Sequence, residues 1–437
     1  MPVTHASSRR LVAAQDNGFP AQALRKQFPA LARAGDFAFF DNAAGAQIPQ
    51  ASFDAVNHLL VANNAQRGGR FYHSIAVDET VTRGRASIAA FLNARRPEEV
   101  ALGMNATSFI RTISLAIGQS LQGRDEIIVT ELDHEANIGT WLALAPFGAR
   151  FVWWKLRKDG NLHLEDLEPL LSPRTRLVAC TLASNALGTI VDVRAVADLT
   201  HAAGAEIFVD AVHFGPHGLI DVQAFDCDYL VCSGYKIFAP HMGFLWGRYE
   251  LLKSLPTFRE DFIPDEPPFK IEAGTFIYEN VAGMDAAIGY LASVGAQLAA
   301  NTPHRHRPTH AIGASTLQEN LRTAMTAIRA YEQELSIELL RVLQDYGATI
   351  YGIDDPAQVS RRVPTFCFNL PGVAPAAVSE ALAAANIGIR DGHLYTPRLM
   401  ESLGLEIATG AARVSLVHYN TVAEVHRFGA ALRALRR

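Results

Sequence analysis

The segment from Glu206 to Gly247 contains two short apolar runs, and each run leads into a charged residue. The first run, at 207–209, is Ile-Phe-Val and is followed by Asp210. The second, at 229–232, is Tyr-Leu-Val-Cys and leads through Ser-Gly-Tyr into Lys236. Continuous apolar runs of this length are typical of strands buried on both faces of a parallel sheet. Because functional side chains gather where such strands end, we expect Asp210 and Lys236 to converge on one crevice.

Lys236 lies between an apolar strand and the apolar pair Ile237-Phe238, and most of the positive charge of the chain is arginine. An isolated ammonium there is costly unless it is neutral, paired or used covalently. Pyridoxal phosphate uses such a lysine as a Schiff base and needs a carboxylate that keeps its ring nitrogen protonated. Lys236 and Asp210 suit these two roles. From these residues alone, the alternative is a lysine that extends from a strand end to solvent.

The motifs VDAVH at 209–213 and SGYKIFAPHMGFLWG at 233–247 resemble the active-site strand pair of class V aminotransferases. This pyridoxal-phosphate group includes cysteine desulfurases, isopenicillin N epimerases and kynureninases. Motifs from Asp41 to Asn420 resemble the desulfurase branch in order, so the resemblance covers nearly the whole chain. It implies an α/β protein of fold type I, with a large, mostly parallel seven-stranded sheet domain and a smaller C-terminal α+β domain.

The chain has 437 residues, 49% of them hydrophobic, which is enough for a large core in more than one domain. We expect an N-terminal arm and helix at 1–35 that joins the small domain. The large cofactor-binding domain is expected at 36–295 and the small domain at 296–437. Between them, 301–314 is a candidate linker or surface loop.

Composition argues against several classes of partner. The formal charge is −5, and the densest basic run, His304 to Arg307, is expected to be a solvated loop rather than a nucleic-acid or phosphate site. No stretch resembles a transmembrane helix or a secretory signal, so we expect a soluble cytoplasmic protein with a loose arm up to about Pro20. The four cysteines lack metal-type spacing, and no metal site is expected.

Several segments outside the central strand pair also have strand or helix character. Strands are expected at 100–103, 127–130, 150–154, 177–181, 348–351 and 365–370. Helices are expected at about 78–93, 105–121, 194–203, 282–294, 315–346 and 375–386.

The phosphate of the cofactor is expected at the N-terminus of the helix that begins near Asn105, because unpaired backbone N–H groups and the helix dipole favour an anion. The resemblance implies contacts from the Ala106 amide and from Thr107, although a threonine at a helix start is often only a cap. Ser233 and Tyr235 match further phosphate contacts, with tyrosine where desulfurases have histidine. The resemblance also implies that Thr275 reaches the phosphate of the neighbouring subunit in a homodimer.

The cofactor ring is expected to meet three other polar residues. His134 lies in a segment that resembles the E-H-H-A-N motif of the family, whose first histidine stacks on the ring and can move a proton near the substrate α-carbon. A lone histidine at a strand end is, however, commonly structural. Asn185, in a segment that resembles SNxxG, is implied to reach the phenolic oxygen and the substrate carboxylate. His213 replaces the glutamine of desulfurases.

Besides Asn185 and Tyr395, four residues are candidates for substrate binding on the strength of the resemblance. Arg413 matches the arginine that binds the substrate α-carboxylate in two hydrogen bonds, and Arg390 assists it. Ala43 lies in a small-residue motif whose amides approach the same carboxylate. Arg70 replaces a desulfurase histidine near the substrate and suits a second anionic group, although a surface loop arginine is the alternative.

Tyr395 marks the main departure from the desulfurase pattern. The segment Arg390 to Tyr395 aligns with the R-x-G-H-x-C loop, and tyrosine takes the place of the cysteine that accepts sulfur. A phenol cannot form a persulfide. We therefore predict that the chain is not a conventional cysteine desulfurase and that Tyr395 shapes the substrate pocket.

The residues leave the reaction branch open for an amino acid or related amine. Transamination is favoured because it needs no further specialised group, with Lys236 and His134 as catalytic residues. A lyase that cleaves C–S or other β-bonds and an amino-acid epimerase are alternatives. A relative that binds the cofactor or a partner without catalysis is the non-enzymatic alternative.

Overall fold

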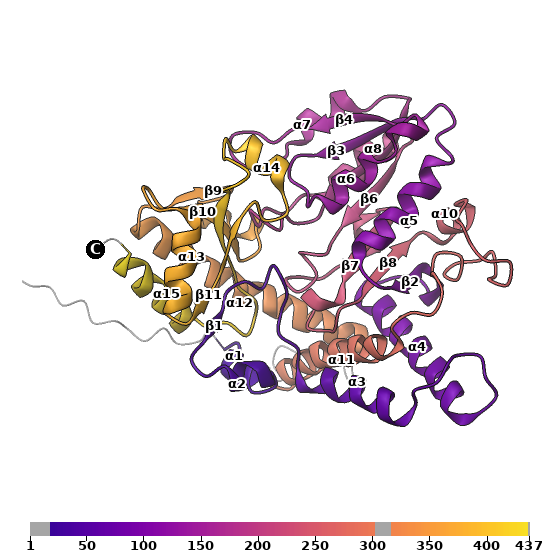
Figure 1. Cartoon of the computed structure of the whole chain (residues 1–437), viewed down its shortest axis with the longest axis horizontal. Helices are drawn as coiled ribbons and strands as arrows, with labels where there is room; N and C mark the ends of the chain where they lie inside the picture. The colour runs from indigo at the N-terminus through magenta and orange to yellow at the C-terminus, as the bar shows by residue number, and fades with distance from the viewer. Residues whose placement is uncertain (1–17, 302–315, 436–437) are drawn as a thin grey trace, which may run out of the picture.

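The computed structural model describes residues 18–301 and 316–435 of the chain (Figure 1). Its strands are β1 (Ala38–Phe39), β2 (Val100–Gly103), β3 (Glu126–Thr130), β4 (Arg150–Trp154), β5 (Thr175–Thr181), β6 (Glu206–Asp210), β7 (Tyr229–Ser233), β8 (Gly243–Gly247), β9 (Thr349–Tyr351), β10 (Thr365–Asn369), β11 (Ile387–Gly388), β12 (Arg390–Gly392) and β13 (Ala411–Ser415).

Its α-helices are α1 (Ala21–Arg25), α2 (Pro29–Arg33), α3 (Gln50–Ala62), α4 (Tyr72–Phe91), α5 (Ala106–Gly118), α6 (Ala136–Leu142), α7 (Leu164–Leu167), α8 (Val193–Ala202), α9 (Val222–Phe225), α10 (Tyr249–Ser254), α11 (Tyr278–Asn301), α12 (Leu317–Asp345), α13 (Pro375–Ala384), α14 (Pro397–Ser402) and α15 (Val422–Ala434). The 3₁₀ helices used below are η4 (Gly234–Lys236) and η6 (Pro356–Arg361).

A seven-stranded sheet forms the centre of the molecule, in the order β2-β8-β7-β6-β5-β3-β4. Strands β3 to β7 pair in parallel with their neighbours in this group, whereas β8 runs antiparallel to both β2 and β7. The expected large, mostly parallel sheet of seven strands is confirmed. The register places Thr181, Asp210 and Val231 side by side, so that neighbouring strands end at one edge.

Both faces of this sheet are covered, which explains the continuous apolar runs in its strands. Successive side chains of a strand point to opposite faces. In β3, Ile127 and Val129 pack into a cluster with α5 and α6, whereas Ile128 packs into the larger cluster that includes α4, α8, α11 and α12. All three side chains are fully buried.

The C-terminal part of the chain forms a second, antiparallel sheet in the order β12-β13-β10-β9. Figure 1 shows this unit with α13 and α15 at one end of the molecule, beside the N-terminal helices. Strand β1 pairs in parallel with β11, with Ala38 opposite Ile387. Arg25 of α1 also forms an ion pair of 3.0 Å with Glu424 of α15. The smaller α+β unit is confirmed, while the exact division at 36–295 and 296–437 stays a prediction.

Helix α12 links the two parts of the molecule. It begins with a capping box in which Thr316 and Glu319 bind each other's backbone amides. Its Glu332 forms a hydrogen bond with His217, in which Nδ1 of the histidine lies 2.8 Å from Oε2 of the carboxylate. Both side chains are almost fully buried. The segment that follows β6 is therefore attached to α12 by a polar contact inside an apolar core.

The observed elements depart from the expected ones in two places. Helix α4 begins at Tyr72 instead of about residue 78. The apolar pattern did not indicate this earlier start, because Tyr72 and Ile75 are exposed and give the first turn no buried apolar face. Helix α10 lies in a segment for which the sequence analysis expected no helix. The arm at 1–17, most of the candidate linker at 301–314 and the basic run at 304–307 lie outside the described residues.

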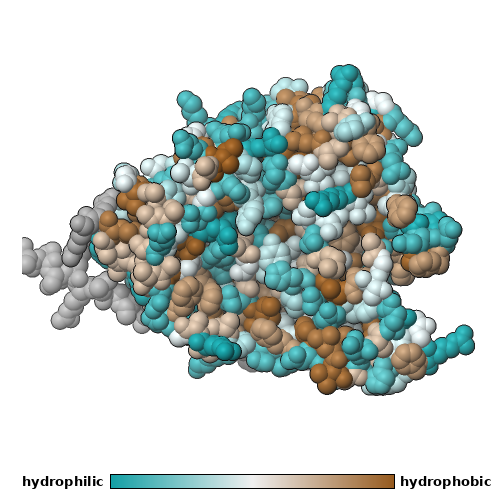
Figure 2. All heavy atoms as spheres, in the orientation of Figure 1, coloured by the Kyte–Doolittle hydropathy of each residue, from teal (hydrophilic) through white to brown (hydrophobic). Residues whose placement is uncertain are grey.

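The face in Figure 2 mixes polar and apolar residues, with an apolar group at the lower edge where Figure 1 places α3. The exposed large apolar side chains of that helix are Phe53, Leu60 and Val61. Across the residues that the structure describes, none of the helices is long and apolar enough to cross a membrane.

Candidate active site

Asp210 and Lys236 both line a cavity of about 90 Å³ at the carboxyl edge of the central sheet. Asp210 is the last residue of β6, and Lys236 ends η4, which follows β7 directly. The structure thus brings together the two residues from which the sequence argument began. The other predicted cofactor residues that line this cavity are Ala106, Thr107, His134, Asn185, His213, Ser233 and Tyr235.

Lys236 is a buried amine without a described partner. It is 5% exposed, and none of the described residues forms a hydrogen bond or ion pair with its ammonium. Burial and the charge of Arg413 together lower the pKa of Lys236 to about 8, while Asp210 acts in the opposite direction. A far larger fraction of this amine than of an ordinary lysine is therefore neutral near physiological pH and able to act as a nucleophile or base.

Asp210 is also buried, and burial raises its pKa above the ordinary value. Its Oδ1 accepts a hydrogen bond of 2.9 Å from the Val212 amide, and Lys236 is the cation that favours its charged form. Asp133 lies behind it, hydrogen-bonded to Thr130 and to Asn137, and burial raises the pKa of Asp133 to about 7. Asp210 therefore has few partners of its own and is ready to pair with a cationic group in the cavity.

His134 is held as a neutral ring at the mouth of the cavity. Its Nδ1 accepts a hydrogen bond of 3.0 Å from the Ala136 amide, which places the ring proton on Nε2. Burial, with the charges of Lys236 and Arg413, lowers the pKa of His134 to about 4. The ring of Tyr395 stacks on it, with centroids 5.7 Å apart and planes 24° apart.

The N-terminus of α5 lies at one end of the cavity. Asn105 caps the helix through the Ser108 amide, which leaves the first amides, at Ala106 and Thr107, directed to the cavity end. No other described residue bonds to the hydroxyl groups of Thr107, Ser233 and Tyr235, which line the same end. These donors suit a phosphate.

The close approach of α5 to the sheet depends on Gly243 in β8. A Cβ at this position would lie 2.4 Å from the carbonyl carbon of Asn105 and 2.7 Å from the amide nitrogen of Ala106. Only glycine lets the strand backbone pass this close to the helix start.

Two buried polar atoms on the cavity wall have no hydrogen-bond partner in the part of the chain that the structure describes. Asn185 donates from Nδ2 to the Leu394 carbonyl at 2.8 Å, but its Oδ1 has no partner. His213 contacts the Thr365 hydroxyl through Nε2 at 3.0 Å, but its Nδ1 has no partner. Burial lowers the pKa of His213 well below its ordinary value. Unsatisfied buried groups are rare in native proteins, and these two fit a bound polar ring.

Arg390 and Arg413 lie together, and Asp41 joins them. Asp41 Oδ1 is 2.8 Å from Nη2 of Arg413, and Asp41 Oδ2 is 2.8 Å from Nη2 of Arg390. Arg413 also donates to the carbonyl of Asn185 at 2.9 Å, while its buried Nε has no partner. The sequence analysis did not assign a role to Asp41, because no local pattern shows that it meets residues about 350 positions later.

The loop that carries Tyr395 is anchored to the segment that carries His134. The carbonyl of Tyr395 accepts from the Glu135 amide at 2.9 Å, and Arg398 forms an ion pair with Glu135 at 3.3 Å. Leu394 and Tyr395 both have positive φ angles, +54° and +60°, which are uncommon for residues other than glycine. Such conformations are frequent at functional sites.

The remaining predicted residues lie outside the cavity. Arg70 is exposed in the loop before α4. Thr275 is exposed and accepts a hydrogen bond of 2.7 Å from Gln66. Ala43 is buried, and its amide donates to the hydroxyl of Ser415 at 2.8 Å. Their roles stay predictions.

Comparison with known proteins places this geometry in a family. The model of class V aminotransferases matches residues 38–312 and 304–428. The chain belongs to the class V aminotransferase family. As a member of this family, it has pyridoxal 5'-phosphate as its cofactor, and the buried amine, the helix N-terminus and the two unpartnered polar atoms fit that group.

Individual relatives differ in their names. The chain is 33% identical to the aminotransferase-like protein FGM3 of Gibberella zeae, and the match covers 95% of this chain and 98% of that protein. It is 32% identical to a cysteine desulfurase of Synechococcus elongatus, with 96% of this chain and 64% of that protein covered. A nonribosomal peptide synthetase-like enzyme of Aspergillus fumigatus, fsqF, is 33% identical, with 93% of this chain but 26% of that protein covered.

Solved structures agree on the fold. The cysteine desulfurase of Thermococcus onnurineus superimposes with a TM-score of 0.81 at 24% identity, covering 95% of this chain and 97% of that one. The cysteine desulfurase CsdA of Escherichia coli gives 0.79 at 25% identity, covering 96% and 99%. The class V aminotransferase described here therefore has the expected fold of type I.

Proposed function

We propose that this class V aminotransferase transfers the amino group of an amino acid or related amine, with Lys236 as the residue that holds the cofactor and moves the substrate α-proton. The observation that carries the proposal is the buried amine of Lys236, with its pKa lowered to about 8, in a cavity that has no thiol on its wall. The name of the FGM3 relative supports the same reaction class.

The state of the four cysteines supports the exclusion of persulfide chemistry. Cys180, Cys227, Cys232 and Cys367 are all fully buried. Burial raises the pKa of Cys367 to about 12 and raises the pKa values of the other three. Because the thiolate is the reactive form, these thiols are poor acceptors of sulfur. Tyr395 supplies a phenol at the place where desulfurases have a thiol.

Bound pyridoxal phosphate acts as an electron sink that makes the substrate α-proton acidic. Lys236 removes that proton and returns it, because its lowered pKa of about 8 allows the amine to exchange protons near physiological pH. Asp210 would hold a proton at the pyridine nitrogen, and the N-terminus of α5 would bind the phosphate. His134 would contact the ring and, as a neutral imidazole, would add no charge there.

The two arginines support an amino acid as the substrate. Arg413 is buried and Arg390 half-buried, and both form ion pairs with Asp41. An α-carboxylate that replaces Asp41 on Arg413 would gain a charge-assisted hydrogen bond and fix the α-carbon. Tyr395, half exposed beside His134, then limits the substrate side chain.

A β-eliminating lyase is the second candidate. The relatives named cysteine desulfurase favour it, since their name implies cleavage of a C–S bond. Loss of a β-substituent needs the same α-proton transfer by Lys236 and no thiol. Epimerisation would need the proton to return to the opposite face of the α-carbon.

We also propose a homodimer with a shared site. Thr275 and Arg70 are exposed and lie outside the cavity of their own chain, which is the placement expected for residues that serve a neighbouring subunit. Sedimentation analysis of the loaded protein, with Thr275→Ala as the variant, tests this. A monomer with full cofactor affinity would contradict it.

The deciding experiment is anaerobic mixing of the loaded enzyme with a panel of amino acids and amines, followed by cofactor absorbance and product analysis. Stoichiometric formation of a keto acid, reversed by an added keto acid, supports transamination. Ammonia with a released β-fragment indicates a lyase, and inversion at the α-carbon indicates an epimerase. Tyr395→Phe serves as the matched control for pocket shape. No response to any amine, equal to that of Lys236→Ala, would support a catalytically silent protein.

A further inference from the structure

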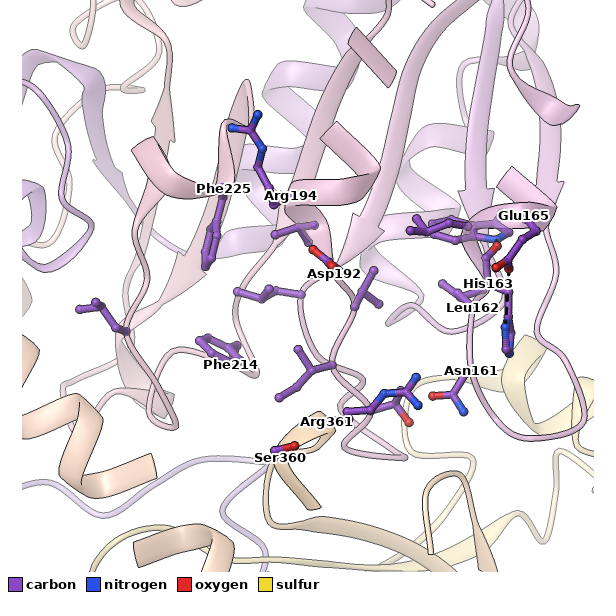
Figure 3. A pocket seen from close by; sticks show the side chains of 18 of the residues that line it. Asn161, Leu162, His163, Glu165, Asp192, Arg194, Phe214, Phe225, Ser360 and Arg361 are labelled. Atoms are coloured by element: carbon purple, nitrogen blue, oxygen red, sulfur yellow. Dashed lines mark hydrogen bonds and ion pairs between the residues drawn. The ribbon is translucent and has the colours of Figure 1, made fainter. Parts of the chain in front are cut away.

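A second, larger cavity of about 690 Å³ lies beside the active site (Figure 3). Phe214 and Phe225 lie on one side of it, and the segment from Asn161 to Glu165 on the other. Ser360 and Arg361, from η6, lie along the lower edge in this view. The cavity therefore lies where the central sheet domain meets η6 and α12.

The wall of this cavity is mainly apolar. Trp154 and Leu182 are fully or almost fully buried on it, and Phe214 is 6% exposed. Leu162, Ile190 and Leu219 contribute further apolar surface. A cavity of this size with aromatic and aliphatic walls has the character of a site for a small molecule.

Two arginines at one edge of the cavity form no ion pair with a described residue. Arg329 of α12 donates to the Ser360 carbonyl at 2.6 Å and lies over the ring of Phe214 at 5.8 Å, but has no ion pair. Arg361 donates only to Gln358, at 3.0 Å. Arg329 is partly removed from water, and this burial lowers its pKa. Its positive charge would therefore be stabilised by an anion in the cavity.

Most of the other charged groups at the cavity form ion pairs. Arg194 forms ion pairs with Asp198 at 2.7 Å and with Asp226 at 3.3 Å. Asp192 caps α8 through the Ala195 amide. The other lining groups that can carry charge, His163 and Glu165, form ion-pair contacts with Asp159 at 2.7 Å and with Arg157 at 3.9 Å. Among the described residues, Arg329 and Arg361 are therefore the lining cations without an ion pair, and Asp192 is the lining carboxylate without one.

This cavity shares a wall with the active site. Along the segment after β5, Thr181, Ala183 and Asn185 line the catalytic cavity, whereas Leu182 and residues 189–193 line the larger one. After β6, His213 lines the catalytic cavity and Phe214 the larger one. A ligand in the larger cavity therefore contacts residues whose neighbours in the chain line the catalytic cavity.

We infer that the larger cavity is a second ligand site, which takes an organic anion with an apolar body, such as a medium-chain carboxylate. The carboxylate pairs with Arg329 and Arg361, and the chain packs on Trp154, Phe214 and the neighbouring aliphatic residues. Through the shared wall, occupancy of this site changes the affinity of the catalytic cavity for its cofactor, and the coupling is reciprocal.

The test uses the protein loaded with pyridoxal phosphate and the anionic probe anilinonaphthalene sulfonate, whose fluorescence reports binding. Octanoate should displace the probe about tenfold better than octanol, which has the same chain without the charge. Arg361→Gln and Arg329→Gln should each weaken probe binding by about tenfold. Arg433→Gln, on α15 and away from the cavity, is the matched control and should leave binding unchanged.

Two further results decide the inference. Ile190→Trp fills the cavity and should abolish probe binding, so unchanged binding in this variant would overturn the site. Equal displacement by octanoate and octanol would overturn its anionic character. Titration of the apoprotein with pyridoxal phosphate, with and without saturating octanoate, tests the shared wall, and identical cofactor affinities would overturn the coupling. Thermal unfolding of each variant verifies that the fold is intact.

Discussion

Asp41 and Arg413 are bound to each other across the site, with Oδ1 of the carboxylate 2.8 Å from Nη2 of the guanidinium. Asp41 thus occupies one of the donors that a substrate α-carboxylate needs, and it also holds Arg390. This ion pair balances the charge of the buried Arg413 while no substrate is bound. Substrate binding at this corner is then an exchange of one carboxylate for another.

Replacement of Asp41 by asparagine should tighten the binding of carboxylate ligands. Without the competing charge, a simple carboxylate inhibitor should bind roughly tenfold better. Titration of cofactor absorbance with the inhibitor measures this effect. Asp36→Asn, which removes an exposed carboxylate shortly before β1, is the matched control and should leave the affinity for the inhibitor unchanged. Weaker binding in Asp41→Asn would show instead that Asp41 orients Arg413 for the substrate.

Covalent attachment of pyridoxal phosphate to the apoprotein should depend on the lowered pKa of Lys236. The neutral amine is the reactive form, so the attachment rate should rise with pH and level off above about pH 8. Stopped-flow absorbance measures this rate. A midpoint near 10.5, the ordinary lysine value, would contradict the burial argument.

The same pKa also has a consequence for stability. Between about pH 8 and 10.5 the unfolded chain holds more protons at Lys236 than the folded apoprotein does, so this group makes the free energy of unfolding rise with pH in that window. Relative to Lys236→Met, the rise should be on the order of 3 kcal/mol. Urea unfolding at several pH values measures it, and Lys155→Met, an exposed lysine, should show no such trend relative to wild type.

Gly243→Ala should weaken cofactor binding by displacing the start of α5. The added Cβ would meet the backbone of Asn105 and Ala106, which cannot rotate away as a side chain would. We expect a loss of about 1–3 kcal/mol in stability and at least about a tenfold loss in affinity for pyridoxal phosphate. Gly289→Ala in α11, where nothing lies within 4 Å, is the control and should leave affinity intact. Equal affinities in the two variants would show that α5 does not bind the phosphate.

Glu332→Ala should destabilise the protein strongly. It leaves His217 buried without its partner, and breaking a buried pair costs about 3–5 kcal/mol. Glu338→Ala, on the same helix with a partly exposed ion pair, should cost less than about 1 kcal/mol. Urea unfolding compares the two. Similar small losses would indicate that the contact between His217 and Glu332 contributes little to the docking of α12.

Parts of the site that depend on local pattern could be predicted from the sequence. The apolar runs before Asp210 and Lys236 fix two parallel strands, and the ends of parallel strands lie at one edge. The N-terminus of α5 followed from Asn105 and the strand before it. The motifs supplied the rest of the cavity wall, including Asn185 and His134.

Contacts between distant segments could not be predicted in this way. Nothing near Asp41 indicates that Arg390 and Arg413 will meet it, and nothing near His217 indicates Glu332. The second cavity is likewise built from several separate segments whose apolar residues look like ordinary core. The feature that distinguishes it is the pair Arg329 and Arg361. Only the folded structure shows that these two arginines have no carboxylate partner among the described residues.

The pairing of β1 with β11 imposes an order on biogenesis. The strands and helix that form the cofactor end of the site all lie between residues 100 and 247, so a ribosome releases them while the last third of the chain is still unmade. Asp41 must wait much longer, because Arg390, Arg413 and the β11 strand emerge near the end of translation. A nascent chain can thus form its cofactor cavity before Arg390 and Arg413 are available to bind a substrate carboxylate. The ability to bind substrate follows only when the last strands have been made.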